Sequence, residues 1–555
     1  MSQTPPILHR PSEKERKYDR QLRLWAASGQ AALESANILL VNSGAGTVGA
    51  ETLKNLVLPG IGRFAIYDET QVSEADLGVN FFLDEASLGK SRSKSLTELI
   101  LELNPDVQGT WYPNEELRTL DSLLAASPVF TIILYTHPIS PEQLASLEAY
   151  GQKHKTPLVA IHSAGFYSYF QVNLRGAFPI VDTHPDETAT TDLRLLGPWP
   201  ELVSFADELT KDIDGLDNFE HGHLPYVVIL LHYLKEWKVA HDGKYPATFK
   251  EKTELRKIVQ AAARTNNPEG GEENFEEAAA AVVKTVVVPS LPSGLKEVFE
   301  YEHTDPVEQR SGFWLIADAV KQFYEKHQCL PLPGKLPDMK AESKVYIQLQ
   351  SIYKAKARKD AAEVLQIAQA APGGDLIDPA EVDLFCKNAA FVKLINATSG
   401  AATAVKISKA DRLKSAADRE FAADETAALS LSPLSLLPIY LALQATAHVG
   451  LSTNGTAAGG GGNELEGESS ASSFDADSIL ASIAAQVPGA EKQERVIQAA
   501  QEVARAQGGE LHNVAALMGG IVAQETIKIV TKQYIPADNT CVYDGIGGRV
   551  QVLRL

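Results

Sequence analysis

Apolar and polar positions follow a strand, turn, helix, strand pattern between Asn37 and Asp68. The run Ile38–Val41 is continuously apolar, which is typical of a strand buried in a parallel sheet. After a glycine-rich turn, the next apolar positions are spaced for one face of a helix that Pro59-Gly60 ends: Val48, Leu53, Leu56 and Val57. A second apolar run, Phe64–Ile66, leads to Asp68. The pattern predicts a β-α-β unit with an acidic residue after its second strand.

The turn in this unit has the form G-x-G-x-x-G, with glycines at Gly44, Gly46 and Gly49, and Asp68 follows the last of them by 19 residues. In this context, glycines let backbone N–H groups approach phosphate at a helix N-terminus, and the acid can meet a ribose hydroxyl. The pattern predicts a nucleotide site. The alternative is a tight Rossmann-like turn that binds no nucleotide.

Upstream of this unit, Ser12 and Glu15 have the spacing of a capping box. The box predicts the start of a helix that continues through Tyr18–Trp25. Arg20 and Arg23 lie three residues apart and therefore share one face of that helix. Two interpretations stay open: an amphipathic helix packed on a domain edge, or an arginine held out toward an anion.

Alternating strands and helices continue to about residue 175. Helices are predicted over Leu96–Leu103 and from Ser140, and strands over Val129–Leu134, Leu158–Ile161 and Phe166–Leu174. This alternation predicts an α/β fold with a Rossmann-like, doubly wound and largely parallel sheet. A ligand crevice is expected beyond the carboxyl ends of the strands, where the glycine turn lies.

From Gly176 onward the pattern becomes mostly helical. Helices are predicted from Pro225, over Phe313–Tyr324 and from Val345, and residues 266–277 are predicted to form a loop. The helix from Val345 carries cations that form either a docking face or a solvated face: Lys354, Lys356, Arg358 and Lys359. The glycine- and serine-rich stretch 452–473 is predicted to be a flexible loop.

The C-terminal segment returns to a regular pattern. Val514–Ile521 predicts a helix in which Gly519-Gly520 allows another backbone to approach closely, and strands are predicted around Cys541–Tyr543 and Val550–Leu553. Cys541 and the two other cysteines, Cys329 and Cys386, lie far apart and lack any local activating pattern, so we interpret all three as structural thiols.

Composition narrows the function classes. The 555-residue chain has a net charge of −20, which makes nucleic acid a poor partner for its surface. The absence of a disulfide pattern indicates a reducing compartment, and the longest apolar run near Val227–Leu231 is too short to span a bilayer. We therefore expect a cytoplasmic or nuclear protein that binds neither nucleic acid nor a membrane.

Several motifs resemble one known family. They are Lys17–Trp25 in the opening helix, Leu53–Gly62 in the first helix and its turn, and Val514–Glu525 in the returning helix. Two further stretches, Glu272–Glu277 and Leu336–Met339, resemble the regulatory, non-catalytic subunits of neddylation-activating enzymes in the ubiquitin-activating-enzyme family. The resemblance implies an inactive adenylation domain, a large and mostly helical insertion, and a heterodimer with a catalytic subunit.

The same resemblance shows which catalytic positions differ here. Active members carry an Asp-x-Asp pair where this chain has Ile66 and Asp68, and an arginine-bearing motif where it has Gly78–Phe82. Their lysine in the next helix corresponds to Arg92, and their magnesium-binding Asp falls within Tyr135–His137. Because ATP chemistry needs a metal and cations against the triphosphate, the resemblance implies a vestigial turn that holds neither metal nor nucleotide.

The resemblance also gives Arg20 a role: it would reach ATP phosphates held by the partner, as an arginine finger in trans does. We therefore expect no cofactor in this chain, Mg-ATP in the catalytic subunit, and a ubiquitin-like modifier as the molecule activated. The expected domains are 1–175 and 511–555 in the adenylation fold, with 176–510 as the insertion. Two other hypotheses stay open, an autonomous NAD-binding oxidoreductase and a pure scaffold protein.

Overall fold

The computed structural model divides into two compact units, one formed by residues 1–178 and 395–555 and the other by residues 179–394. Each unit is described by itself. The structure describes the following residues: 11–186, 191–265, 270–303, 306–307, 310–395, 409–430, 432–448 and 475–555. The predicted loop at 452–473 lies outside these ranges.

The first unit is built on an eight-stranded sheet with the order β10-β9-β6-β5-β4-β1-β2-β3. Strands β1 to β5 run parallel, whereas β6, β9 and β10 pair antiparallel at one side, so the sheet is mixed rather than largely parallel. The strands are β1 (Asn37–Val41), β2 (Arg63–Tyr67), β3 (Gln108–Tyr112), β4 (Ile132–Thr136), β5 (Leu158–Ala164), β6 (Tyr167–Asn173), β9 (Thr540–Asp544) and β10 (Arg549–Leu553). The α/β class is confirmed, and the return of the chain after the insertion supplies the antiparallel side.

The predicted β-α-β unit is present with small shifts at its ends. β1 pairs with β2 and β4, and Leu40 lies opposite Ile66 on one side and Leu134 on the other. All five residues of β1 are buried, as expected for a central parallel strand. Helices on this part of the sheet are α3 (Thr47–Val57), α4 (Glu74–Leu77), α5 (Arg92–Leu101), α6 (Leu120–Ala126) and α7 (Pro141–His154).

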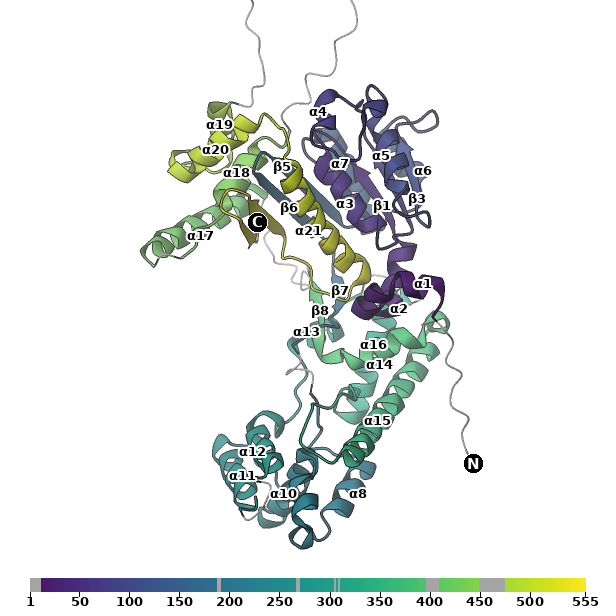
Figure 1. The fold of residues 1–555 in the computed structure, drawn as a ribbon, viewed down its shortest axis with the longest axis vertical. Helices are drawn as coiled ribbons and strands as arrows, with labels where there is room; N and C mark the ends of the chain where they lie inside the picture. The colour runs from purple at the N-terminus through teal and green to yellow at the C-terminus, as the bar shows by residue number, and fades with distance from the viewer. Residues whose placement is uncertain are drawn as a thin grey trace, which may run out of the picture. The chain divides into compact units, whose positions relative to one another are not determined.

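The predicted C-terminal helix is α21 (His512–Thr531), and it packs along α3 (Figure 1). A Cβ atom placed on Gly519 would lie 2.7 Å from the Glu51 Cβ atom and 2.9 Å from the Thr52 backbone nitrogen. The close backbone approach predicted for Gly519-Gly520 is therefore confirmed at Gly519. α21 is long and apolar enough to span a membrane by length and composition alone, but most of it is buried against its neighbours in this unit.

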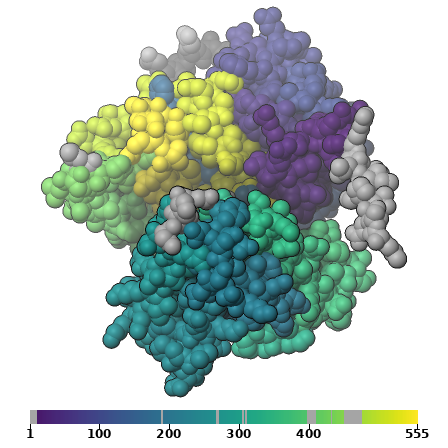
Figure 2. All heavy atoms as spheres, turned by 60° about the horizontal axis from the view of Figure 1, so that its bottom comes forward, coloured from purple at the N-terminus to yellow at the C-terminus, as the bar shows by residue number. Residues whose placement is uncertain are grey.

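The N-terminal segment differs from its prediction. The capping box of Ser12 and Glu15 is present, but the helix that it opens, α1 (Glu13–Lys17), ends before the arginine motif. Tyr18 interrupts the helix because its side chain is buried and its hydroxyl accepts a hydrogen bond from Asn104 at 3.1 Å. A second helix, α2 (Asp19–Ser35), begins after it, is interrupted by non-helical backbone at Trp25 and Ala26, and packs on α21. N-terminal and C-terminal segments of the described chain thus lie side by side (Figure 2).

Four further helices belong to the sheet unit and not to the insertion. They are α17 (Lys409–Leu429), α18 (Leu437–Ala445), α19 (Ala476–Gln486) and α20 (Glu494–Ala506). Their apolar side chains form one core with Tyr167 and Tyr169 of β6 and Val542 of β9. The division of the chain thus differs from the predicted one, in which the insertion extends to 510, because these helices cover the antiparallel side of the sheet.

The second unit is helical and has a core of its own, formed by residues from Leu193 to Tyr353. Its two ends meet in a hydrogen-bonded strand pair, β7 (Phe178–Val181) and β8 (Val392–Ile395). Its helices are α8 (Pro200–Leu209), α9 (Asn218–Gly222), α10 (Tyr226–Ala240), α11 (Phe249–Ala261), α12 (Glu273–Thr285), α13 (Ser293–Phe299), α14 (Gly312–His327), α15 (Ser343–Ala370) and α16 (Pro379–Lys387). The predicted loop over 266–277 is wrong at its end, because α12 begins at Glu273.

Candidate functional site

The glycine turn lies where the sequence predicts, between the carboxyl end of β1 and the start of α3. Gly44 has φ +61°, and a Cβ atom on it would lie 2.8 Å from the Pro138 Cδ atom. The turn is therefore packed against the loop after β4, and the fold itself requires glycine at this position.

Asp68, the expected ribose acceptor, is 1% exposed and its carboxylate is already engaged. One of its oxygens accepts hydrogen bonds from Arg92 Nε at 2.7 Å and Asn42 Nδ2 at 2.9 Å. The other accepts from the Thr70 backbone N–H at 3.0 Å. A ribose hydroxyl would have to displace these donors, which counts against the dinucleotide interpretation.

Arg92 is buried beside the glycine turn and links two acidic residues to the backbone of that turn. It forms ion pairs with Asp68 and with Asp76, the latter at 2.9 Å, and donates to the Gly44 carbonyl oxygen at 2.8 Å. Burial opposes the charge of the guanidinium, but the two carboxylates outweigh it and hold the pKa of Arg92 above its ordinary value. Arg92, which the resemblance places at the lysine position of active members, thus directs its charge at its own chain.

A residue that the sequence analysis did not single out, Glu510, fills the N-terminus of α3. Its Oε2 atom accepts the Val48 backbone N–H at 2.8 Å, in the position where a helix N-terminus accepts phosphate. Burial raises the pKa of the Glu510 carboxyl to about 7, although the Val48 hydrogen bond and the charge of Arg92 act in the opposite direction. An internal carboxyl group therefore occupies the anion-binding end of this helix.

Three histidines lie together at the loop after β4, where the resemblance places the family's magnesium-binding Asp. The ring of His137 lies 5.2 Å from that of His162 and 6.3 Å from that of His448. Burial, together with the neighbouring histidines, keeps the pKa of His162 well below its ordinary value, so this ring is neutral. In the described ranges, no group of three His, Cys, Asp or Glu side chains is arranged to hold a metal.

Taken together, these contacts do not fit a metal-bound triphosphate. The guanidinium of Arg92 is committed to Asp68 and Asp76, and the N-terminus of α3 already holds the Glu510 carboxyl. A triphosphate would meet three carboxyl groups at the glycine turn, and a catalytic site needs the opposite charge there. Side chains of the protein itself thus fill the place where a ligand crevice is expected, and this arrangement is called the closed crevice below.

Arg20 lies on the first turn of α2 and is exposed. No described residue forms a hydrogen bond or an ion pair with it, whereas Arg23 is paired with Asp19 at 3.0 Å. The start of α2 is held in place by Tyr18 and by Lys17, whose ammonium group contacts Asp106 at 2.7 Å. A fixed helix therefore presents an uncommitted guanidinium to the outside of this unit.

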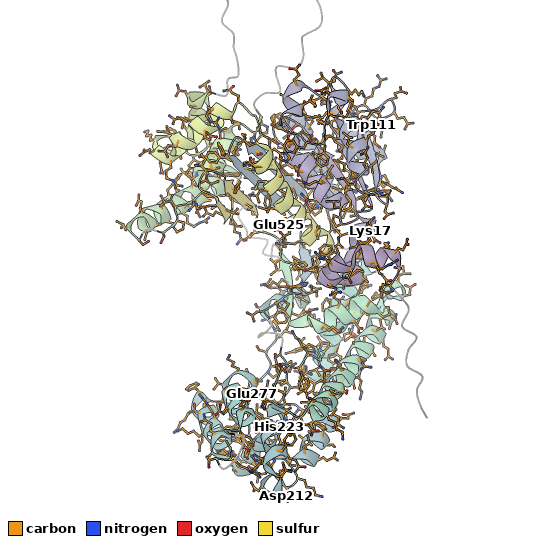
Figure 3. All side chains as sticks on the ribbon, in the orientation of Figure 1. Lys17, Trp111, Asp212, His223, Glu277 and Glu525 are labelled. Atoms are coloured by element: carbon orange, nitrogen blue, oxygen red, sulfur yellow. The ribbon has the colours of Figure 1, made fainter. Side chains whose placement is uncertain are left out.

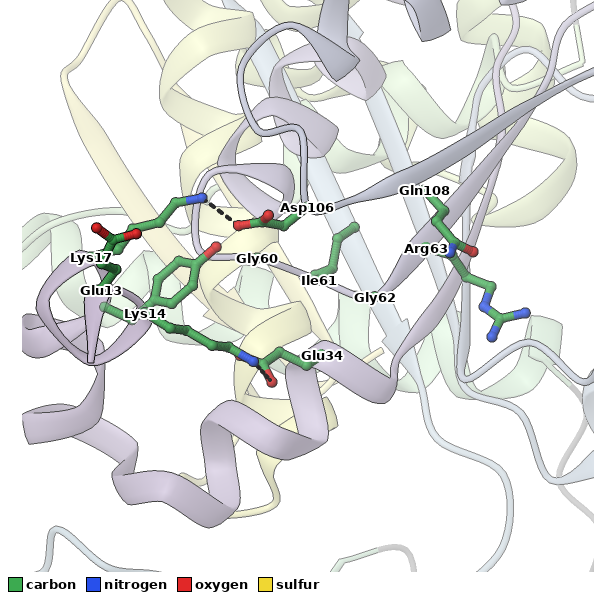
Figure 4. A pocket seen from close by; sticks show the side chains of 11 residues that line it. Glu13, Lys14, Lys17, Glu34, Gly60, Ile61, Gly62, Arg63, Asp106 and Gln108 are labelled. Carbon is green, nitrogen blue, oxygen red and sulfur yellow. Dashed lines mark hydrogen bonds and ion pairs between the residues drawn. The ribbon is translucent and has the colours of Figure 1, made fainter. Parts of the chain in front are cut away.

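A polar cavity of about 670 Å³ lies at the opposite end of the sheet (Figure 4). Arg63 and Gln108, which begin β2 and β3, line it together with residues of α1. Ion pairs between Lys17 and Asp106 and between Lys14 and Glu34 cross its wall. Ligands of such sheets bind at the carboxyl ends of the strands, so this cavity is not the expected site.

The three cysteines are free thiols, and Cys386 and Cys541 are buried. Burial raises the pKa of all three, to about 12 for Cys386 and about 11 for Cys541. A thiol with a raised pKa is a poor nucleophile at neutral pH. The geometry supports the interpretation of structural thiols.

The two stretches that resemble regulatory subunits both contribute to the core of the second unit, through Phe275 in the first and Leu336 and Met339 in the second. In the first, the buried Glu272 carboxylate lies 2.8 Å from His221 Nδ1. Glu277, labelled in Figure 3, accepts the backbone N–H of Lys340, just after Met339, at 2.9 Å. Both stretches thus act as internal structure of the insertion.

Comparison with known proteins identifies the class. The model of the ThiF family matches residues 18–555, so the chain belongs to this family. Within it, the chain belongs with the regulatory subunits of NEDD8-activating E1 enzymes. It is 36% identical to the Drosophila melanogaster subunit over the full length of both chains. Identity to the Xenopus laevis subunit is 34%, covering 96% of this chain and 97% of that one.

The similarity extends to plants. The Arabidopsis thaliana regulatory subunit AXR1 is 31% identical, covering 98% of this chain and 97% of that one. The solved structure of Escherichia coli MccB is 16% identical and covers 29% of this chain and 50% of that chain, with a TM-score of 0.26. The family assignment therefore rests on the sequence matches.

Proposed function

We propose that this chain is the non-catalytic half of a heterodimer that activates NEDD8, and that it acts on ATP bound by a catalytic partner subunit. One observation carries the proposal: the chain closes its own crevice with Arg92 and Glu510, yet leaves Arg20 unpaired on a fixed helix. The relatives named as regulatory subunits imply a catalytic partner. This chain carries no cofactor of its own, and Mg-ATP belongs to the partner.

The face of α2 that carries Arg20 is suited to a protein partner. Leu24 lies four residues after Arg20, so both side chains share this face, and Leu24 is 52% exposed. Arginine is enriched in protein–protein interfaces, and the uncommitted guanidinium on this face is available to a partner. Covering it would bring the guanidinium out of water, where its attraction for phosphate is stronger. The heterodimer would work in the cytoplasm or the nucleus.

Replacing Arg20 by Ala tests the proposal. In the assembled heterodimer, Arg20→Ala should slow ATP–pyrophosphate exchange by about a thousandfold, the lower end of what an arginine finger contributes. Size-exclusion chromatography should show that the heterodimer still forms. Arg20→Lys should restore part of the rate, because it keeps the charge and loses the planar fork.

Arg23→Ala is the matched control, since Arg23 lies on the same helix but is paired with Asp19. It should change the rate only a few-fold. The isolated chain should exchange no pyrophosphate. An unchanged rate for the assembled Arg20→Ala heterodimer would contradict the role in trans and favour the pure scaffold, whereas exchange by the isolated chain would contradict the closed crevice.

A further inference from the structure

A groove in the helical unit has no part in the function proposed above. It lies between the loop Leu332–Leu336, the middle of α15 and the end of α16, and encloses about 650 Å³. This volume falls within the roughly 300–1,000 Å³ of ligand pockets in proteins. Its floor is apolar and buried, with Leu332, Leu336, Ala361 and Cys386.

The rim of this groove is positively charged. Four exposed cations line it, and Asp383 is the one acid among the lining residues: the cations are Lys335, Lys354, Arg358 and Lys387. The chain as a whole has a net charge of −20, so a surface with three more positive than negative groups runs against the general charge. Such a local reversal of sign selects an anionic partner.

Three of the four cations of the rim have no acidic partner among the residues that the structure describes. Lys354 and Arg358 lie four residues apart on α15, where like charges repel. Lys356, between them, is paired with the buried Asp360 and is outside the groove. Among the described residues, no carboxylate forms an ion pair with Lys354, Arg358 or Lys387, and Lys354 donates only to the Gln350 amide at 3.0 Å. A bound carboxylate would relieve this repulsion.

We propose that this groove binds an acidic segment of another protein, with apolar side chains on the floor and carboxylates on the rim. The guanidinium of Arg358 matches a carboxylate in two-point geometry, and the lysines act as point charges around it. A nucleic acid fits less well, because its backbone would leave the apolar floor unused and would meet the acidic remainder of the surface. The proposal does not depend on the role of Arg20.

Selection from a library of random twelve-residue peptides displayed on phage, against the immobilised full-length chain, tests this. Peptides that combine Asp or Glu with Leu, Ile or Phe should be enriched. A fluorescein-labelled copy of the best peptide should lose at least tenfold in affinity toward Lys354→Glu/Arg358→Glu, and its affinity should fall as salt rises. Lys335→Glu/Lys387→Glu, which changes the loop and α16 instead, should give the same loss.

The control is Lys344→Glu/Lys359→Glu, two exposed lysines of α15 that do not line the groove. It should change the affinity less than twofold, which separates binding in the groove from general attraction. Enrichment without acidic residues, or equal loss in the control, would overturn the proposal. Tighter binding of a labelled twelve-nucleotide single-stranded DNA that depends on Arg358 would also overturn it, in favour of a nucleic-acid site.

Discussion

At the scale of single residues, Arg92 and Glu510 occupy the places where a nucleotide would meet a cation and a helix N-terminus, and both are engaged with their own chain. Both side chains are buried, with Arg92 at 2% and Glu510 at 6% exposure. Removing one partner of a buried charged network leaves the others uncompensated. The crevice is therefore a part of the folded core, and its charges contribute to stability in a way that depends on pH.

Glu510→Gln should remove one pH dependence of folding. The pKa of the Glu510 carboxyl is raised from 4.5 to about 7, so the folded state keeps a proton that the unfolded state releases. The contribution of this group to stability is therefore complete below pH 4.5 and declines as the pH rises to 7. Relative to the wild type, the variant should gain up to ~3 kcal/mol across this window, at about 1.4 kcal/mol per unit.

Urea unfolding at several pH values between 4.5 and 8 would measure this difference. Glu494→Gln is a suitable control, because Glu494 begins α20 and is exposed. Its difference from the wild type should stay flat. A flat difference for Glu510→Gln as well would contradict the raised pKa and the closed crevice.

At the scale of elements, the sequence predicts the helices and strands that are specified by the pattern of neighbouring residues. The continuous apolar run of β1 and the helical spacing of α3 identify the β-α-β unit, because both signals lie within a few residues. β3 was not predicted, since it is the edge strand of the sheet and none of its five residues is buried. β4 begins three residues after its predicted start at Val129, because the apolar pattern does not mark that end.

The candidate site shows the same limit more strongly. Asp68 and the glycine turn are visible in the sequence as a motif. Glu510 lies 462 residues from Val48, with which it pairs, and nothing near it in the sequence marks it as part of the turn. Arg92 was recognised only as a replacement for a lysine, because its partners depend on how α5 packs. The motif predicts the location of the crevice, and tertiary contacts decide that it is closed.

The contact between α21 and α3 provides a matched test on one helix. Gly519→Ala places a methyl group 2.7 Å from the Glu51 Cβ atom, so the helices must separate. We expect the unfolding free energy to fall by about 1–3 kcal/mol, as overpacking typically costs. Gly520→Ala has only the Asn55 amide nitrogen at 4.0 Å, and the helix propensity of alanine should leave it neutral or up to about 1 kcal/mol more stable.

Urea unfolding followed by circular dichroism would compare the two variants with the wild type. The comparison is controlled, since neighbouring glycines receive the same methyl group in the same helix. Equal effects of both substitutions would show that α21 does not depend on a close approach at Gly519.

At the scale of the whole molecule, the chain contains two units that have separate cores. The core of the insertion is formed within residues 193–353, and the sheet unit buries its own residues on β6, β9 and α18 to α20. The insertion begins and ends in the paired strands β7 and β8, so its two chain ends are adjacent. Adjacent ends and an independent core are what a domain inserted into another fold requires.

We therefore expect a fragment spanning residues 178–395 to fold alone and to unfold cooperatively on heating, because its core is complete without the sheet. The full chain should show two calorimetric transitions. Glu272→Gln replaces one of two buried carboxylate oxygens, which contact His221 Nδ1 and accept the Arg264 backbone N–H, by an amide donor. It should lower the stability of the insertion by about 1–3 kcal/mol. It should shift the transition of the fragment and only the corresponding transition of the full chain.

If the fragment lacks a cooperative transition, or if Glu272→Gln shifts both transitions equally, the two units are one cooperative structure. Arg20 and the groove would then have to be treated as parts of a single folding unit.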